Sequence, residues 1–169
     1  MDQPTQELQL DRAKLIAEGL DDSYLFIQGP PGSGKTYTGA HLILHLIQRG
    51  NRVGVASGSH AAIHNLLEEV EEHAPSEKAF AGLKKYSDEG NRYESKHGLI
   101  ENSKEIADFA AGAYELVAGT AWLFCCEEMD DTLDYLFIDL GRHRDYADMP
   151  SAVAVNGLLP RGFSVPTPV

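Results

Sequence analysis

The chain has 169 residues, of which 43% are hydrophobic and 24% are charged, and its formal net charge is −12. This length suits one domain with a hydrophobic core and is too short for two of ordinary size. The net charge disfavours a strong free-standing nucleic-acid binder, because phosphate contacts supply most of that affinity. The apolar runs are shorter than the roughly 18 residues of a membrane span. The only cysteines, Cys125 and Cys126, are adjacent. That spacing suits neither a disulfide nor a metal motif, so we expect a cytoplasmic protein.

Helices and strands alternate with short turns in the first half of the chain, which is typical of a parallel sheet wrapped by helices. The apolar spacing predicts helices over residues 6–20, 35–49 and 59–73 and strands over residues 24–27 and 52–57. The second helix is apolar nearly all round, which predicts burial on more than one side. Ser59 is expected to cap the third helix.

Residues 29–36 read G-P-P-G-S-G-K-T and fit the phosphate-loop pattern G-x-x-x-x-G-K-[ST]. Glycines let backbone N–H groups turn toward phosphate oxygens, and the next helix points its N-terminus at the anion. We expect Lys35 to reach the β- and γ-phosphates of ATP and Thr36 to offer its hydroxyl to Mg²⁺. The predicted nucleotide site consists of Gly29, Pro30, Pro31, Gly32, Ser33, Gly34, Lys35 and Thr36.

Residues 74–105 carry six acidic and six basic residues and are expected to be a polar, weakly ordered insertion in the domain. One interpretation is a solvated surface excursion. The other is a nucleic-acid contact, since basic residues interleaved with aromatic ones suit phosphate contact and base stacking. The residues of that alternative are Lys84, Lys85, Tyr86, Arg92 and Tyr93.

Regular structure is predicted again as a helix near residues 103–112 and strands over residues 115–118 and 135–138. The last strand ends at Asp139, and an acid there, downstream of a phosphate loop, is the expected Mg²⁺ ligand. Between these strands Trp122 is interpreted as a core residue rather than a base-stacking platform. The predicted fold class is therefore α/β, a three-layer P-loop NTPase domain of RecA-like type over residues 1–140.

With these residues in view, the chain resembles the N-terminal motor domain of superfamily 1 helicases. The most similar group is typified by the nonsense-mediated-decay helicase and includes members fused to RecB-like nucleases. The motif-like segments are residues 29–36, then V-A-S-G-S-H-A-A-I at 55–63, V-A-G-T-A at 117–121 and L-F-I-D at 136–139. The resemblance implies an ATPase that binds single-stranded DNA or RNA along Ser59, His60 and Thr120. It also implies an adenine-reading glutamine, for which Gln6 and Gln9 are candidates.

The resemblance ends at Leu140, where ATP-hydrolysing members have the Glu that orients the attacking water. Leucine cannot accept a proton, so nucleotide binding is expected to outlast hydrolysis. Residues 141–169 are expected to be an aberrant or disordered tail. The fold would then be incomplete unless residues 152–155 supply the strand between those of residues 24–27 and 135–138. The second motor domain of the family, which supplies an arginine finger, is also expected to be missing.

Three functions remain open from the sequence. The favoured one is the ATP-binding part of a superfamily 1 helicase-type ATPase that is not a complete motor by itself. A non-hydrolysing nucleotide-binding module is the alternative that Leu140 favours. A small-molecule P-loop kinase is a third, although no arginine-rich lid is evident.

Overall fold

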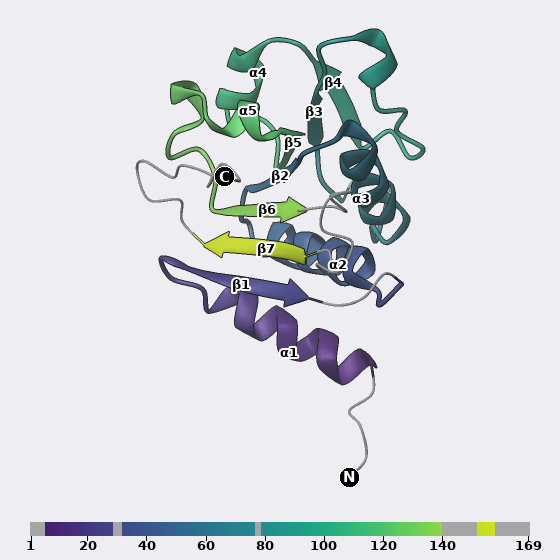
Figure 1. Ribbon diagram of the computed structural model, residues 1–169, viewed down its shortest axis with the longest axis vertical. Coiled ribbons are helices and arrows are strands. Elements are labelled where there is room, and N and C mark those ends of the chain that lie inside the picture. The colour runs from purple at the N-terminus through teal and green to yellow at the C-terminus, as the bar shows by residue number, and fades with distance from the viewer. Residues whose placement is uncertain (1–5, 29–31, 77–78, 140–151, 158–169) are drawn as a thin grey trace, which may run out of the picture.

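One seven-stranded sheet organises the structure, a computed structural model that describes residues 6–28, 32–76, 79–139 and 152–157 (Figure 1). The helices are α1 (Gln6–Glu18), α2 (Lys35–Gln48), α3 (His60–Glu72), α4 (Ile106–Ala110) and α5 (Ala121–Phe124), with short 3-10 turns η1 (Glu89–Asn91) and η2 (Glu127–Met129). The strands are β1 (Ser23–Gln28), β2 (Val53–Ser57), β3 (Gly82–Lys85), β4 (Ile100–Ser103), β5 (Leu116–Thr120), β6 (Tyr135–Asp139) and β7 (Ala152–Gly157). They are ordered β1-β7-β6-β2-β5-β3-β4.

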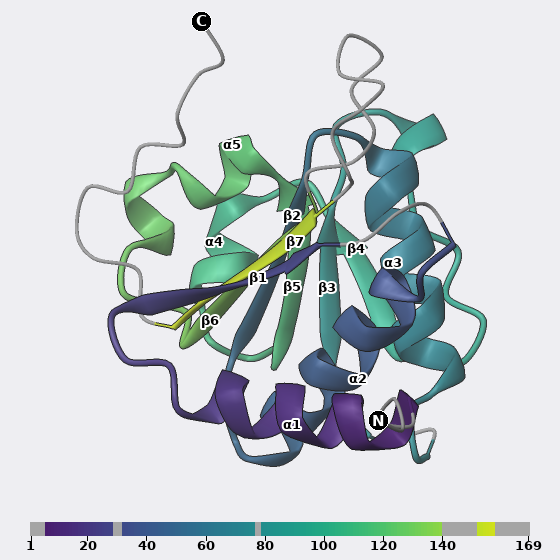
Figure 2. The ribbon, with the colours of Figure 1, turned by 60° about the horizontal axis from the view of Figure 1, so that its bottom comes forward.

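Helices cover both faces of the sheet, with α1, α2 and α3 on one side and α4 and α5 on the other (Figure 2). Successive residues of β5 point to opposite faces, as the pleat requires. Leu116 and Ala118 therefore pack in the α1–α3 core, whereas Val117 packs against the α4 and α5 side. Strand β2 is buried at all five positions because it lies between β6 and β5. The predicted α/β class with a three-layer, RecA-like sheet is confirmed.

Strand β7 lies between β1 and β6 and runs antiparallel to both. The five strands β6, β2, β5, β3 and β4 are parallel, and β1 runs in their direction because two reversals separate it from β6. The tail thus supplies the strand that the sequence suggested for this gap, in the opposite direction. An antiparallel return needs no crossover helix, whereas a parallel strand does. The expectation of an aberrant or disordered tail is therefore wrong for residues 152–157, which form β7, while Leu140 and residues 141–151 and 158–169 lie outside the described residues.

The stretch 74–105 is part of the sheet, which differs from the weak order expected of it. It contributes β3 and β4, which pair in parallel, and β3 also pairs with β5. The buried carboxylate of Glu71 on α3 anchors the connection between these strands. It accepts hydrogen bonds from the Tyr93 hydroxyl at 2.8 Å, from the Ser95 hydroxyl, and from the backbone N–H groups of Lys96 and Leu99. The sequence did not predict these two strands for two reasons. Their composition is mixed and polar, and the strands that they pair with are distant in sequence.

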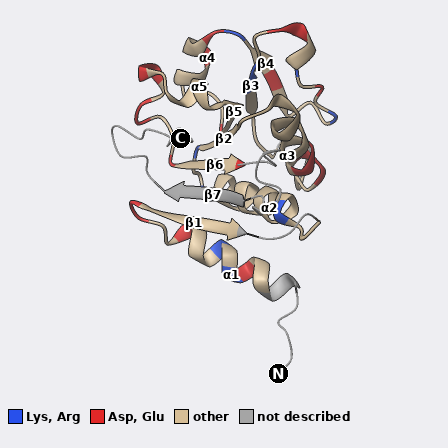
Figure 3. Ribbon diagram, viewed as in Figure 1, with Lys and Arg blue, Asp and Glu red and all other residues tan. Residues whose placement is uncertain are grey.

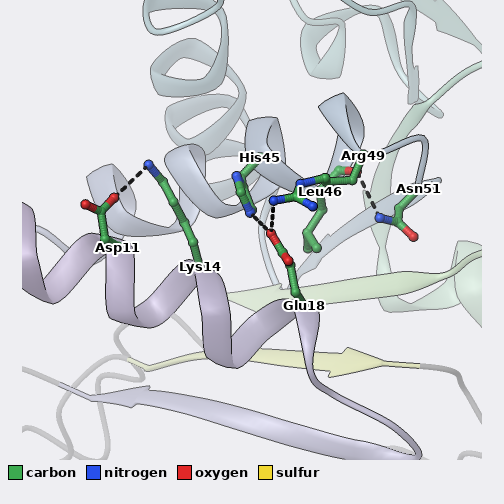
Figure 4. A network of polar contacts seen from close by, with 7 residues as sticks. All are labelled: Asp11, Lys14, Glu18, His45, Leu46, Arg49 and Asn51. Atoms are coloured by element: carbon green, nitrogen blue, oxygen red, sulfur yellow. Dashed lines mark hydrogen bonds and ion pairs between the residues drawn. The ribbon is translucent and has the colours of Figure 1, made fainter.

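A polar seam joins α1 to α2 (Figure 4). Glu18 accepts hydrogen bonds from the His45 ring and from Arg49, the latter at 2.9 Å. Beside this seam Ala17 is fully buried, whereas Leu15 and Ile16 are 70% and 44% exposed. The face of α1 that packs against α2 therefore carries Ala17 and Glu18, and the two larger apolar side chains beside them point toward solvent. In the described part of the chain, no helix is long and apolar enough to span a membrane.

Candidate nucleotide and nucleic-acid site

The described half of the phosphate loop has the backbone conformation that its glycines were expected to supply. Gly32 has φ 79° and Gly34 has φ 78°, values in the left-handed region that side chains other than glycine rarely adopt. Gly34 is also the N-cap of α2, a 14-residue helix in which seven apolar or small residues are buried. A glycine-rich turn that leads into the accessible N-terminus of a helix concentrates backbone N–H groups where an anion can bind.

Lys35 and Thr36 form the first turn of α2. The Lys35 ammonium donates a hydrogen bond to the Ser33 hydroxyl at 3.2 Å, so the loop holds this side chain near its own backbone. Lys35 is half-buried and Thr36 is exposed, which leaves the Thr36 hydroxyl accessible. Gly29, Pro30 and Pro31 of the predicted site lie outside the described residues.

The strand register aligns the ends of four strands at one edge of the sheet. Ser57 at the end of β2 is level with Thr120 of β5 on one side and Asp139 of β6 on the other. Asp139 is in turn level with Val153 of β7, which is level with Ile27 of β1. Because neighbouring strands are about 4.8 Å apart, the backbone of Asp139 lies about 10 Å from that of β1, whose end leads to the phosphate loop. Open α/β sheets bind ligands at this carboxyl edge.

The predicted metal ligands Thr36 and Asp139 would offer only oxygen atoms, the donor type that suits Mg²⁺. Mg²⁺ in nucleotide sites is commonly held by one or two protein oxygens together with phosphate oxygens and water. Within the described ranges no group of three or more His, Cys, Asp or Glu residues could hold a metal by itself. The residues present therefore fit a metal that arrives with a phosphate ligand rather than a closed protein cage.

Ser59, His60 and Thr120 all lie at the same carboxyl edge, although their side chains differ in what they do. The Ser59 hydroxyl accepts a hydrogen bond from the Ala62 N–H at 3.2 Å and so caps α3, as predicted. Thr120 is the N-cap of α5 without a side-chain capping bond. The preceding Gly119 allows α5 to fold back onto β5, because a Cβ there would meet the Leu123 side chain at 2.8 Å.

His60 contacts a residue that sequence reasoning did not connect to this edge. Its Nδ1 lies 2.9 Å from the Nζ of Lys84, a β3 residue with 0% exposure. Burial lowers the pKa of Lys84 to about 8. Burial also lowers the pKa of His60, with further lowering by the charges of Lys84 and His64 and an opposing effect from Asp88. No local pattern in the sequence indicates this pair, because His60 and Lys84 are 24 residues apart and belong to different elements.

The basic and aromatic residues of the stretch 74–105 do not form one exposed face. Lys84 is fully buried and Tyr93 is 7% exposed, so neither is accessible to nucleic acid, and that part of the alternative is wrong. Arg92 and Lys104 flank the Tyr86 ring, at 5.2 and 4.9 Å from its centroid. Both cations also pair with Glu89, whose pKa they lower. Figure 3 shows acidic residues spread over α3 and the segments around β3 and β4, with basic residues interspersed among them.

Trp122 is 83% exposed on α5, two residues after Thr120. The interpretation of Trp122 as a core residue is therefore wrong. The neighbouring Leu123 takes the buried position of this helical turn instead. The buried Ser57 is level with both Thr120 and Asp139; it lies in the motif-like segment 55–63 but was not predicted as a site residue.

Comparison with known proteins agrees with this arrangement. The model of the AAA domain family matches residues 7–107, which is 101 of the 169 residues. A protein of Saccharomyces cerevisiae, whose name describes it as a candidate ATP-dependent RNA helicase, ECM32, is 29% identical over 99 residues. That match covers 57% of this chain and 9% of the relative.

Two relatives carry the name regulator of nonsense transcripts 1. The homologue from Neurospora crassa is 38% identical over 65 residues, and the protein from Caenorhabditis elegans is 38% identical over 66 residues. Each match covers 38% of this chain and 6% of the relative, so the chain corresponds to less than a tenth of these proteins. No solved structure matches the chain significantly. On the family match and these relatives, the chain belongs to the AAA domain family, in the superfamily 1 helicase group typified by the nonsense-mediated-decay helicase.

Proposed function

We propose that this chain is the ATP-binding part of a superfamily 1 helicase-type ATPase that acts on single-stranded DNA or RNA. The observation that carries the proposal is the turn of Gly32 and Gly34, left-handed at both glycines, at the start of the buried helix α2. Asp139 at the same edge of the sheet supports it, since the two halves of such a site come from different strands.

In this proposal the loop N–H groups and the Lys35 ammonium hold the phosphates, and the α2 N-terminus favours their negative charge. The Thr36 hydroxyl and the Asp139 carboxylate are the side chains that would hold Mg²⁺, which neutralises charge on the phosphates. Ser59, His60 and Thr120 would lie along the nucleic-acid strand. We expect the protein to act in the cytoplasm, since its two adjacent cysteines suit a reducing compartment.

Leu140 favours binding without efficient turnover. A positioned general base contributes typically about 10²- to 10⁴-fold to a rate, and leucine cannot fill that role. An arginine finger from a second motor domain would contribute further. The second candidate function is therefore a nucleotide-binding module that does not hydrolyse, and Leu140 is the observation that favours it.

Calorimetric titration with MgATP tests the nucleotide site. Lys35→Ala is expected to weaken binding by about 10- to 100-fold, because it removes charge-assisted hydrogen bonds to phosphates. Lys104→Ala is the matched control, since it removes the same charge from an exposed lysine that contacts Glu89 and Tyr86. Equal affinities for ATP in all three proteins would contradict the proposal. ATPase rates measured beside the affinities separate a motor from a non-hydrolysing module.

The proposed binding of single-stranded nucleic acid can be followed by the intrinsic fluorescence of the protein. Trp122 is the only tryptophan and is exposed two residues after Thr120. Titration with single-stranded DNA and RNA oligonucleotides of equal length is expected to change its fluorescence, with affinity falling as salt rises. If neither DNA nor RNA changes the Trp122 fluorescence, and fluorescence anisotropy of labelled oligonucleotides also shows no binding, the proposed nucleic-acid binding is contradicted while the nucleotide site is not.

A further inference from the structure

Lys84 is a fully buried lysine in the centre of a polar contact. It has 0% exposure on β3. Burying an ammonium is costly unless hydrogen-bond acceptors surround it. Two acceptors do so here: Nδ1 of His60 at 2.9 Å and the backbone carbonyl of Asn91. The buried ammonium thus contacts His60, a residue of the candidate nucleic-acid site, and can influence its protonation.

The contact determines which nitrogen of His60 carries hydrogen. An ammonium has only donors, so the His60 Nδ1 must accept through its lone pair. An imidazolium has hydrogens on both nitrogens and cannot accept. The contact is therefore compatible with one form of His60, the neutral ring with its hydrogen on Nε2.

The groups around His60 favour the same neutral form. The ring is partly buried at the first position of α3, and burial disfavours its charged state. The Lys84 charge from β3 and His64 from the next turn of α3 act in the same direction. Only Asp88, from the segment after β3, opposes them. Burial and the charges of Lys84 and His64 thus outweigh the Asp88 carboxylate, and the pKa of His60 is lowered.

We propose that Lys84 is a positioning residue that fixes His60 as a neutral Nε2–H hydrogen-bond donor for an oxygen or nitrogen acceptor on single-stranded nucleic acid. This role rests on the proposed function, because it takes His60 as a nucleic-acid contact. It also gives the stretch 74–105 a part in the site: β3 delivers the lysine, and the η1 turn delivers the Asn91 carbonyl that shares it. A neutral ring of this kind donates a hydrogen bond to the nucleic acid without adding a positive charge to the site.

The tautomer can be measured in the unaltered protein. Long-range ¹H–¹⁵N spectra of the ¹⁵N-labelled full chain distinguish protonated from unprotonated imidazole nitrogens, and His60→Ala identifies the His60 signals. We expect an unprotonated Nδ1 and a protonated Nε2 from pH 6.5 to pH 7.5. A ring with its hydrogen on Nδ1, or a doubly protonated ring at pH 7, would overturn the proposal without any variant of Lys84.

Lys84→Met then tests the cause. Methionine keeps the unbranched apolar stem in the buried space and removes the ammonium, and melting temperature reports whether the fold persists. In this variant we expect His60 to populate both tautomers and to titrate at higher pH. Lys85→Met is the matched control, because the neighbouring Lys85 donates to the Lys104 carbonyl instead. A His60 spectrum that Lys84→Met leaves unchanged would overturn the positioning role.

Binding to oligo(dT) and oligo(U) tests the consequence. Lys84→Met is expected to weaken binding about two- to tenfold, the cost of one misplaced hydrogen bond. Introducing it into His60→Ala is expected to cause no further loss, since Lys84 acts through His60. An equal loss in both backgrounds would overturn that route. If the unaltered protein binds neither oligonucleotide while showing the Nε2–H tautomer, the proposed function and the ligand assigned to His60 fall, and the tautomer assignment stands.

Discussion

Two buried charged residues, Glu71 and Lys84, attach the stretch 74–105 to the rest of the domain. Glu71 is 2% exposed and accepts four hydrogen bonds from the chain between β3 and β4. Lys84 is fully buried and reaches His60 and the Asn91 carbonyl. Buried charges are tolerated when their hydrogen-bonding capacity is met. Each residue therefore contributes more through the partners it satisfies than through its own charge.

Glu71→Ala is expected to destabilise the protein by about 2–4 kcal/mol, because several buried donors lose their acceptor at once. Urea unfolding followed by circular dichroism measures the change. Glu72→Ala is the control on the same helix, since Glu72 is exposed, and it should change stability by less than about 0.5 kcal/mol. Equal effects of the two substitutions would show that the hydrogen bonds of Glu71 do not anchor this segment.

The lowered pKa of Lys84 predicts a pH dependence of stability. The ordinary value is 10.5 and the folded value is about 8, so between these the unfolded chain binds more protons than the folded one. Stability contributed by this residue therefore rises with pH, by roughly 2 kcal/mol between pH 8 and pH 10. The quantity to measure is the difference between the original protein and Lys84→Met across that range. A difference that does not change with pH would contradict the lowered pKa.

Two strands of the sheet have a glycine where side chains of neighbouring elements come close. Gly54 of β2 faces the side of the sheet covered by α5, and a Cβ there would meet the Leu133, Leu136 and Phe124 side chains at 2.6–2.9 Å. Gly119 has the same relation to α5. The phosphate-loop glycines are different, since Gly32 has open space around it and is required by its φ of 79°. Glycine is thus needed in the strands because a side chain would clash with its neighbours, and in the loop because of its positive φ.

Gly54→Ala is expected to cost about 1–3 kcal/mol, the usual effect of overpacking a core. Thermal unfolding measures it. Gly90→Ala is the control, because nothing lies within 4 Å of a Cβ at Gly90. If Gly54→Ala is as stable as the control, the side chains of Phe124, Leu133 and Leu136 do not pack tightly against β2.

The whole molecule depends on a strand from the tail. Without β7 the backbone groups of β1 and β6 that face each other would lack partners in the sheet, and the phosphate loop that follows β1 would be separated from Asp139. Its antiparallel direction keeps both ladders satisfied while the sheet edge that holds the site remains in place. With a net charge of −12, the proposed association with nucleic acid would depend on local contacts at that edge.

Amide hydrogen exchange tests this arrangement. We expect the N–H groups of residues 152–157 to be protected to a degree comparable with β1 and β6, because β7 has hydrogen-bonded neighbours on both sides. Peptide-level mass spectrometry resolves the three strands. Exchange of residues 152–157 at the rate of an unstructured peptide, with β2 and β5 protected, would show that the sheet is not continuous through β7.

Elements whose signals are local could be predicted from the amino-acid sequence alone. The phosphate loop, the apolar α2, the Ser59 cap and the strand ending at Asp139 were all predicted, because glycine conformation, apolar spacing and capping act within a few residues. Four features could not be predicted and are seen in the three-dimensional structure: the direction of β7, the membership of β3 and β4 in the sheet, the exposure of Trp122 and the contact of Lys84 with His60. These depend on pairing and burial between residues far apart in the chain, for which neither composition nor periodicity carries a signal.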